Sequence, residues 1–307
     1  MTIRSESRLE RLLHRGTFCV TAEVVPPRSA DGSAVTAQAR ALVGYADAVN
    51  LTDNPTSAAH MTPVAGAALV AAAGLEPIVQ ITTRDRNRLG ITSDLLGAWA
   101  LGARSVLCLT GDPPAIGDHP GANAVYDVSV LDLVALVAGL RSEGRLLSGG
   151  SIESPPRYFV GVADVPLAKS YDFSRIEQKA ERGADFVQTQ IVFDVDAFGD
   201  WAERARERGL LERMFVLAGV AVPKGAQTAR YMRKHLPGVV VPDRVVERLD
   251  QAGPDALEEG VRLTQEVVAG LRAIRGIAGI HVMGLGQIEP VRRVIAACGL
   301  LPRPATA

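Results

Sequence analysis

Short apolar runs rich in β-branched residues alternate with longer helical stretches along this chain, and this alternation constrains its fold most strongly. The expected strands are residues 18–25, 46–52, 77–82, 105–110, 158–163, 184–192, 214–221 and 278–283. Most of these runs are continuously apolar, as parallel strands are when helices cover both faces of their sheet. Eight strict β–α alternations predict an α/β protein with a (β/α)₈ TIM barrel rather than an open sheet. No GxGxxG motif follows the first run, which weakens the alternative of a Rossmann fold.

No linker divides the chain, so we expect a single domain over residues 1–307. The Gly-, Ser- and Pro-rich segment 142–157 is interpreted as a surface excursion before the fifth strand. The apolar stretch 64–75 is too short to cross a bilayer and is predicted to be a buried helix. Residues 254–275 are predicted to form a long helix with a buried stripe of Leu257, Val261, Val268 and Leu271. Further helical patterns lie at 131–139, 174–182 and 197–208.

Composition and charge exclude several classes of function. The formal net charge is −1, from 33 basic and 34 acidic side chains, which gives no electrostatic basis for binding nucleic acid or an anionic membrane. The three cysteines lie far apart and are typical of buried small hydrophobes in a reducing compartment. The five histidines show no metal-ligand spacing, and residues 1–15 lack the apolar core of a signal peptide. We therefore expect a cytoplasmic protein without a metal site.

The run 107–113 (LCLTGDP) brings a single carboxylate to a tight turn just beyond an apolar strand. Asp112 would therefore lie where parallel α/β proteins usually hold their chemistry. Gly111 has no Cβ, so the backbone there could approach a flat ligand closely. The alternative is that Asp112 only caps the following helix.

Polar residues recur at the carboxyl ends of seven of the expected strands, where apolar residues would be expected inside a barrel. They are Glu23, Asn50, Thr52, Asp53, Gln80, Thr82, Thr110, Asp112, Asp164, Gln188, Gln190 and His281. Each alone is more often structural, but together they predict one polar pocket at one face of the barrel. A buried carboxyl group such as Glu23 would have a raised pKa, which suits a general acid near neutral pH.

Three arginines, Arg84, Arg86 and Arg88, surround Asp85 in the loop after the third strand. Two interpretations remain open for them. They form a solvated run that neutralises its own charge, or one or two of them bind a phosphate or carboxylate of a ligand.

Four motifs occur in an order and spacing that resemble the methylenetetrahydrofolate reductase family. They are residues 23–27 (EVVPP), the strand ending at Thr52, residues 110–114 (TGDPP) and residues 179–194 (KAERGADFVQTQIVFD). The resemblance extends over roughly residues 16–300. The versions at 53–55, 84–87 and 110–112 resemble the subgroup of reductase domains fused to homocysteine methyltransferase.

This resemblance implies a flavoprotein oxidoreductase of one-carbon metabolism and methionine biosynthesis. The family reduces 5,10-methylenetetrahydrofolate to 5-methyltetrahydrofolate through FAD, and NADH or NADPH reduces the flavin in a ping-pong cycle. A cytoplasmic homo-oligomer with a small-molecule folate substrate is therefore expected. Three alternatives stay open: a 5-methyltetrahydrofolate oxidase using the same site, a folate- or flavin-binding subunit that is inactive alone, and a phosphate-binding barrel isomerase.

The resemblance also implies roles for individual residues. Glu23 would protonate N10 of the folate, Asp112 would stabilise the cation that forms, and Gln190 would hydrogen-bond the pterin or the nicotinamide amide. The positions that match FAD-binding ones are Thr52, Asp53, Gln80, Thr110, Gly111, Asp112, Tyr126, Asp127, Asp172, Arg175 and Lys179. Arg175 and Lys179 share a helical face and would contact the pyrophosphate or ribose, or else form an exposed charged face with Glu177 and Glu181.

Three positions differ from the pattern of many family members, and all of them contact FAD there. Thr110 stands where many members have arginine, and Gln80 where many have histidine. The loop 163–171 is shorter than in many members and lacks the tyrosine and the histidine that those members have there. Because Glu23, Asp112 and Gln190 are retained, we interpret these differences as variation between subgroups.

Overall fold

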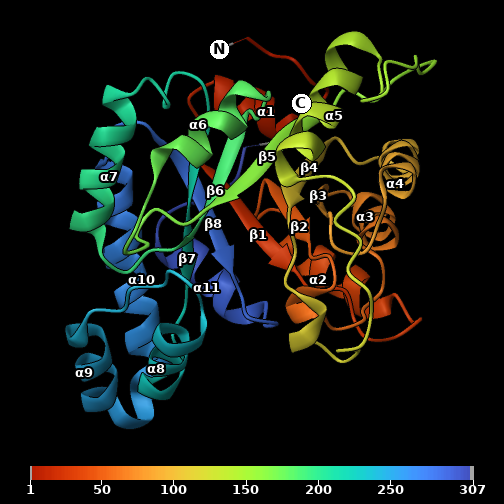
Figure 1. The fold of residues 1–307 in the computed structure, drawn as a ribbon. Coiled ribbons are helices and arrows are strands. Elements are labelled where there is room, and N and C mark those ends of the chain that lie inside the picture. Colours follow the sequence, from red (N-terminus) through yellow and green to blue (C-terminus); the bar gives the residue numbers. More distant parts are fainter. Residues whose placement is uncertain (1, 305–307) are drawn as a thin grey trace.

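A closed barrel of eight parallel strands forms the centre of the molecule in the computed structural model, which describes residues 2–304 (Figure 1). Each strand pairs with its neighbour in chain order, and β8 closes the barrel against β1. The strands are β1 (Cys19–Val24), β2 (Ala48–Leu51), β3 (Glu76–Thr82), β4 (Ser105–Leu109), β5 (Phe159–Asp164), β6 (Phe186–Ile191), β7 (Phe215–Ala221) and β8 (Ile277–Met283). The predicted (β/α)₈ barrel is confirmed, and every strand end lies within two residues of its predicted position.

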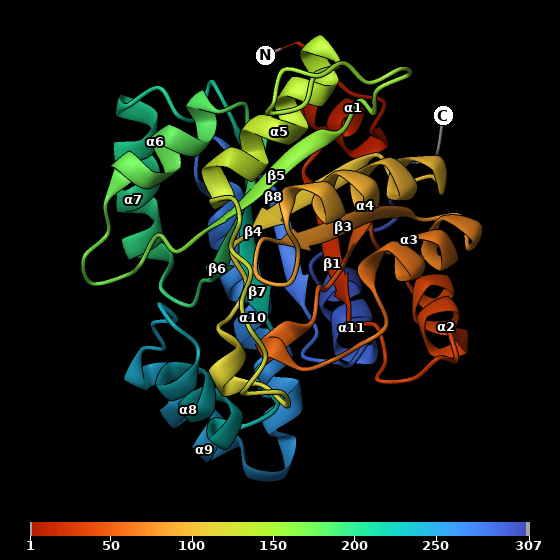
Figure 2. The ribbon, with the colours of Figure 1, turned by 45° about the vertical axis from the view of Figure 1, so that its right-hand side comes forward.

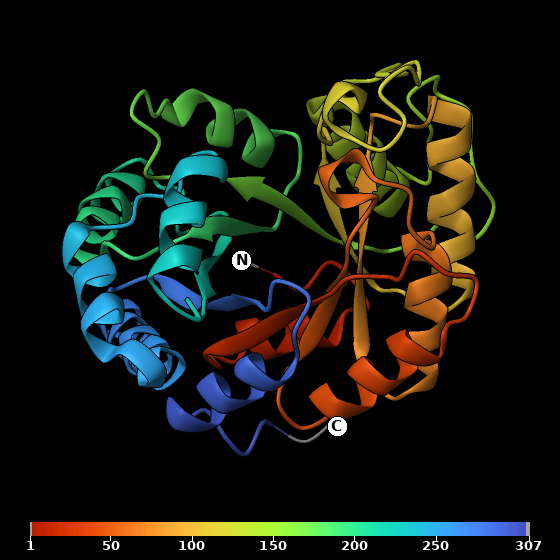
Figure 3. The ribbon, with the colours of Figure 1, turned by 90° about the horizontal axis from the view of Figure 1, so that it is seen from below.

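Helices surround the barrel on all sides, as the view in Figure 3 shows. They are α1 (Arg8–His14), α2 (Ser33–Leu42), α3 (Pro63–Ala72), α4 (Arg88–Ala100), α5 (Val130–Glu143), α6 (Phe173–Glu181), α7 (Val195–Glu207), α8 (Ala226–His235), α9 (Asp243–Ala252), α10 (Ala256–Ala273) and α11 (Glu289–Ala297). Outward-facing strand residues pack against these helices in the largest apolar cluster, which accounts for the continuously apolar strand sequences. Within residues 2–304, no helix has the length and apolar character needed to cross a bilayer.

The amino-terminal end of the barrel is closed by α1, a helix that the sequence analysis did not assign. Leu9, Leu12 and Leu13 of α1 are buried against inward-facing strand residues such as Phe159 and Phe186. Complete burial of a leucine side chain contributes about 1.5–3 kcal/mol. Within residues 2–304, α1 therefore blocks access to the barrel interior from the amino end.

The segment between β7 and β8 contains two additional helices, α8 and α9. Figure 2 shows α8 and α9 standing apart from α2–α4, and they pack with part of α10 around a separate apolar cluster. Neither of these two helices was expected from the sequence. The helix expected at 254–275 begins only at Ala256, after a 3₁₀ turn over Gly253–Asp255, and ends at Ala273. Of its expected stripe, Val261, Val268 and Leu271 are buried and Leu257 is half-buried.

Candidate active site

The carboxyl end of the barrel holds a cavity of about 200 Å³ lined by polar side chains from most of the strands. Seven of the polar residues predicted at strand ends line it, namely Glu23, Asn50, Gln80, Asp164, Gln188, Gln190 and His281. The carboxyl ends of parallel strands in a closed barrel meet at one face, so residues distant in sequence converge there. The other five residues expected at this face are not part of the lining, namely Thr52, Asp53, Thr82, Thr110 and Asp112.

Glu23 is the acidic side chain that enters this cavity from β1. Burial in the barrel mouth raises the pKa of its carboxyl group to about 7, because the charged form loses its hydration. No hydrogen bond or nearby charge from the described residues offsets this effect. Glu23 can therefore be protonated near neutral pH and donate that proton to a bound molecule.

A hydrogen-bonded network of four polar side chains lies inside the barrel beside Glu23. Asn50 and Gln188 exchange two hydrogen bonds, of 2.6 and 3.1 Å between their amide groups. Gln188 also donates to the Thr21 hydroxyl at 3.2 Å, and Thr21 contacts Nδ1 of His281 at 3.0 Å. Burial lowers the pKa of His281 to about 4, so its ring is neutral at physiological pH. Sequence reasoning missed Thr21, although it precedes Glu23 by two positions and must face the same side of β1.

A second cavity, of about 310 Å³, adjoins the first and shares Ala163, Asp164 and Val165 with it. Asp172, Arg175 and Lys179 of the α6 region line it, so the structure brings these three predicted residues together. The Lys179 ammonium donates to the carbonyl of Ala163 at 2.6 Å, which fixes it at the boundary of the two cavities.

Two further side chains define that boundary and its surroundings. The Tyr171 hydroxyl donates to the Asp164 carboxylate at 2.5 Å. Desolvation raises the pKa of Asp164, while Tyr171 and Lys179 counteract the rise. Glu177, expected to share an exposed charged face with Arg175 and Lys179, instead accepts a hydrogen bond from Arg208 at 2.9 Å. The cations of α6 therefore face a cavity and not only solvent.

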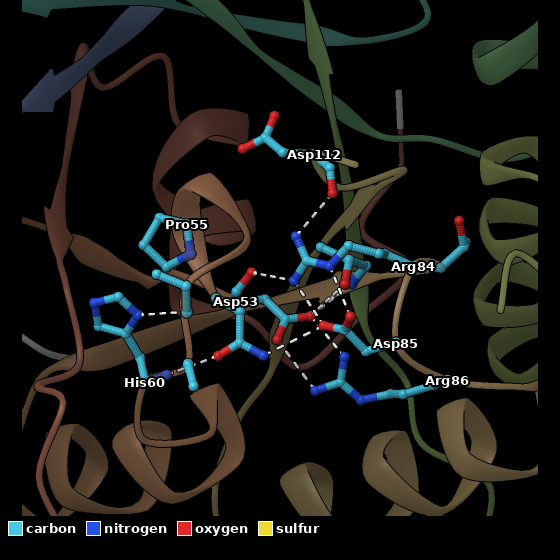
Figure 4. A network of polar contacts seen from close by, with 12 residues as sticks. Asp53, Pro55, His60, Arg84, Asp85, Arg86 and Asp112 are labelled. Atoms are coloured by element: carbon cyan, nitrogen blue, oxygen red, sulfur yellow. Dashed lines mark hydrogen bonds and ion pairs between the residues drawn. The ribbon is translucent and has the colours of Figure 1, made fainter. Parts of the chain in front are cut away.

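Figure 4 shows a network of ion pairs in the loop after β3. Asp53 is buried and binds both terminal nitrogens of Arg86, at 2.7 and 3.1 Å. Arg84 binds Asp85 and also reaches the backbone carbonyls of Asp53 and Asp112. Together with the contact between Arg88 and Asp127 at 2.8 Å, every arginine of this run has a carboxylate partner. However, Arg84 is buried, and the partners of Arg86 and Arg88 lie outside the run, so the arginines do not form the solvated, self-neutralising run of the first interpretation.

Asp112 lies at the edge of the barrel mouth, on the exposed loop after β4. Its carboxylate accepts a hydrogen bond from the backbone amide of Thr56 at 3.1 Å and points away from Arg84 (Figure 4). The alternative that it caps the next α-helix is wrong, because Ser129 is the N-cap of α5. Asp112 instead ties the loop after β4 to the loop after β2.

The glycine beside Asp112 is required by the structure of the loop itself. Gly111 has a φ of +88°, and a Cβ there would lie 3.0 Å from the Cβ atoms of Thr82 and Arg84. The missing side chain therefore makes room for the protein's own residues. A left-handed φ with such close neighbours leaves little possibility of substitution.

The residues expected to bind FAD differ in their availability. Asp53 and Asp127 are engaged by arginines, and Thr110 and Tyr126 are exposed on loops. In contrast, the Thr52 hydroxyl is buried without a hydrogen-bond partner, Gln80 lines the mouth, and Asp172, Arg175 and Lys179 line the adjoining cavity. The two adjoining cavities, one with polar side chains and one with Arg175 and Lys179 in its lining, offer hydrogen-bonding groups and cations of the kind that a dinucleotide requires. In residues 2–304, no cluster of His, Cys, Asp and Glu suited to a metal ion occurs.

The family model described as methylenetetrahydrofolate reductase matches residues 8–299 of the chain. The chain belongs to the methylenetetrahydrofolate reductase family. It is 25% identical over 236 residues to methylenetetrahydrofolate reductase 1 of Schizosaccharomyces pombe, covering 74% of this chain and 36% of that protein. It is 24% identical over 305 residues to a "Probable methylenetetrahydrofolate reductase (NADPH)" of Caenorhabditis elegans, covering 95% of this chain and 44% of that protein. The chain thus spans less than half the length of these curated relatives.

A solved structure shares the barrel of this family member. It is an uncharacterized protein from Clostridium thermocellum described as binding two copies of 5-methyl-5,6,7,8-tetrahydrofolic acid. The match has a TM-score of 0.66 and 13% identity, and it covers 95% of this chain and all of the other. At this identity the likeness establishes the common fold.

Proposed function

We propose that this family member is an FAD-dependent methylenetetrahydrofolate reductase that uses NADH or NADPH. The observation that carries this proposal is Glu23, a carboxyl group with a pKa of about 7 in the cavity at the barrel mouth. Ring opening of 5,10-methylenetetrahydrofolate requires a proton at N10, and an acid with a pKa near the working pH transfers one efficiently. Family membership supports the choice of substrate.

In this proposal FAD would occupy the two adjoining cavities, and when bound it would carry the hydride from the nicotinamide to the folate. Thr52 and Gln80 would hydrogen-bond its ring system, because one has an unpartnered buried hydroxyl and the other lines the mouth. Arg175 and Lys179 would bind the pyrophosphate, with Asp172 beside them. A cation pair of this kind positions an anion without taking part in the chemistry.

Glu23 is the proton donor in the proposed reaction. Its proton passes to N10, the C–N10 bond breaks, and the remaining N5 iminium carbon accepts a hydride. The carboxylate left behind is an anion in a poorly hydrated pocket, which favours the developing cation nearby. Glu23 then needs a proton from solvent before the next turnover.

Gln190 and Asp112 are proposed to orient the folate. The Oε1 atom of Gln190 accepts from the backbone amide of Ile191 at 2.9 Å, which leaves its Nε2 group to donate. This group now donates to the carbonyl of Pro237 at 3.3 Å, a long contact that a pterin or carboxamide oxygen could replace. Asp112 would exchange its hydrogen bond with Thr56 for the substrate cation, so its role requires a movement of the loop.

The visible spectrum of the purified protein tests this proposal first. We expect a yellow protein that anaerobic NADH or NADPH bleaches and that methylenetetrahydrofolate then recolours. A chain that remains colourless after incubation with FAD contradicts the flavin-dependent mechanism. Arg175→Ala is the matched variant, since loss of a pyrophosphate contact should weaken FAD retention without changing Glu23.

A folate-binding subunit without activity of its own is a second candidate. It is favoured by the position of Asp112 outside the cavity and by a structural neighbour described only as a folate binder. Binding of 5-methyltetrahydrofolate without oxidation of NADH or NADPH would support it.

A reductase and a 5-methyltetrahydrofolate oxidase would use the same residues, so the electron donor and acceptor that sustain turnover distinguish them.

We further propose that the protein is a cytoplasmic homo-oligomer that supplies methyl groups for methionine biosynthesis.

A further inference from the structure

The interior of the barrel contains a polar layer where α/β barrels usually have branched apolar side chains. Thr21, Asn50, Gln188 and His281 are all buried in this layer, and each is at most 3% exposed. A buried polar group without a hydrogen-bond partner destabilises a protein. The hydrogen bonds of this layer therefore determine which of its atoms are left to bind a ligand.

The two amides fix each other's orientation. Asn50 donates from Nδ2 to Oε1 of Gln188, and Gln188 donates from Nε2 to Oδ1 of Asn50. Turning one amide alone would bring two donors together and two acceptors together, so a single reversal is excluded. In this arrangement Gln188 presents its second N–H to Thr21, at 3.2 Å.

The Thr21 hydroxyl determines which ring nitrogen of His281 carries the proton. Because Thr21 accepts from Gln188, its own proton is free to be donated. Nδ1 of His281 lies 3.0 Å away and the carbonyl of Ile280 lies 3.4 Å away, so the histidine is the better acceptor. An imidazole that accepts at Nδ1 carries its proton at Nε2 when the ring is neutral.

The other ring nitrogen of His281, Nε2, is available to a ligand in the cavity. His281 lines the same space as Glu23, and among the described residues only its Nδ1 atom has a hydrogen-bond partner. The other ionisable groups that line this cavity are Glu23 and Asp164, and neither forms a hydrogen bond with the ring. Burial keeps the imidazole neutral, with a pKa of about 4.

We propose that His281 presents a neutral Nε2–H donor to a carbonyl oxygen of the ligand head in this cavity, and that Thr21 is the positioning residue that fixes this tautomer. The ligand class is a planar heterocycle with a lactam or carboxamide oxygen. The identification of that ligand as a pterin rests on the proposed function. A neutral donor suits the reaction because an imidazolium would repel the cation that forms on the folate.

Nitrogen NMR of the ¹⁵N-histidine-labelled protein tests the tautomer without any ligand. The His281 signals are assigned by their loss in His281→Gln. We expect a protonated Nε2 and a bare Nδ1 that do not titrate between pH 5 and 8. If both amides were turned together, the hydrogen bonds from Gln188 through Thr21 to His281 would reverse their direction. The proton would then lie on Nδ1, and this result overturns the proposal. Thr21→Val should mix the tautomers, whereas Thr21→Ser should preserve the single form.

Binding of 5-methyltetrahydrofolate, measured by calorimetry at pH 7, tests the role of the donor. We expect His281→Leu to bind about tenfold more weakly, which corresponds to about 1.4 kcal/mol. His281→Gln retains an N–H group and should lose less. Equal affinity of the leucine variant and the wild type overturns the donor role. If the wild type itself binds no folate, the proposed function fails and the pterin assignment fails with it, while the NMR result still decides the tautomer.

Discussion

Glu23 at the carboxyl end of the barrel lacks the partners that hold two buried aspartates at the amino end. At the amino end, Asp47 accepts from the backbone amide of Val20 at 2.8 Å and from Arg303 at 2.5 Å. Asp185 is held in the same way by the amide of Val160 and by Arg141. At the carboxyl end, Glu23 has no such partner and its pKa rises to about 7. Paired acids stabilise the closed end, and an unpaired acid at the open end is available for chemistry.

The replacement Glu23→Gln should have the largest effect on activity. The amide has the size of the carboxyl group but cannot donate a proton to N10, so folate reduction should fall by about 10²–10⁴-fold. Reduction of the flavin by NADH or NADPH should persist, because that half-reaction needs no acid. Stopped-flow absorbance of each half-reaction measures this difference. Equal losses in both halves would contradict the role of Glu23 as the acid.

The replacement Asp47→Ala should have the largest effect on stability. It leaves the buried guanidinium of Arg303, only 6% exposed, without its carboxylate, and such a loss destabilises by about 3–5 kcal/mol. Urea denaturation followed by circular dichroism measures the free energy of unfolding. Asp243→Ala is the matched control, since its pair with Arg233 is exposed and is worth below about 1 kcal/mol. Similar losses in the two variants would refute the contrast between buried and exposed pairs.

The replacement Asp112→Asn should slow folate reduction by a smaller amount. Loss of one charge-assisted contact to the substrate corresponds to about 1–3 kcal/mol, or about 5–150-fold in rate. The introduced amide retains an oxygen that can accept from the backbone amide of Thr56, so loop anchoring is preserved and the replacement tests the charge alone. An unchanged rate in Asp112→Asn excludes this residue from the mechanism.

The barrel could be predicted from sequence because its signal is local and repeated. Each parallel strand is a continuous apolar run, and the alternation with helices repeats eight times. The helix α1 has only seven residues, so its apolar pattern was too short to recognise. Helix α8 buries only Ala226, Ala229 and Met232, which gives a weak helical signal. Helix α9 buries Val245, Val246 and Leu249 at helical spacing, so its signal was present in the sequence and was missed.

The candidate site was predictable where strands position it and unpredictable where loops do. Glu23, Gln80 and Gln190 converge because their strands end at one face. The direction of Asp112 depends on a loop in which Asn54, Thr56 and Ser57 all have positive φ values. Three such non-glycine residues within four positions follow from tertiary contacts and not from local preference. The carboxylate partners of Arg84, Arg86 and Arg88 depend on the same kind of loop packing.

The smallest effect is expected in the way that the free energy of unfolding depends on pH. The pKa of Glu23 is about 7 in the folded protein and near its ordinary value of 4.5 when the chain is unfolded. Between these values the folded state binds more protons than the unfolded state, so this residue makes the protein less stable as the pH rises from about 4.5 to about 7. Glu23→Gln removes that loss, and its advantage over the wild type should grow across this range and then stay constant.

Urea denaturation of wild type and Glu23→Gln at pH 5, 6, 7 and 8 measures this advantage. Asp85→Asn is the control of opposite sign, because Arg84 lowers the pKa of Asp85 below its ordinary value of 3.8. The stabilisation by Asp85 is complete above that value, so its loss should be the same at all four pH values. A Glu23→Gln advantage that does not change with pH would mean that the carboxyl group is charged in the folded protein. The acid at the open end would then resemble the paired acids at the closed end, and the proton donor would have to be sought elsewhere.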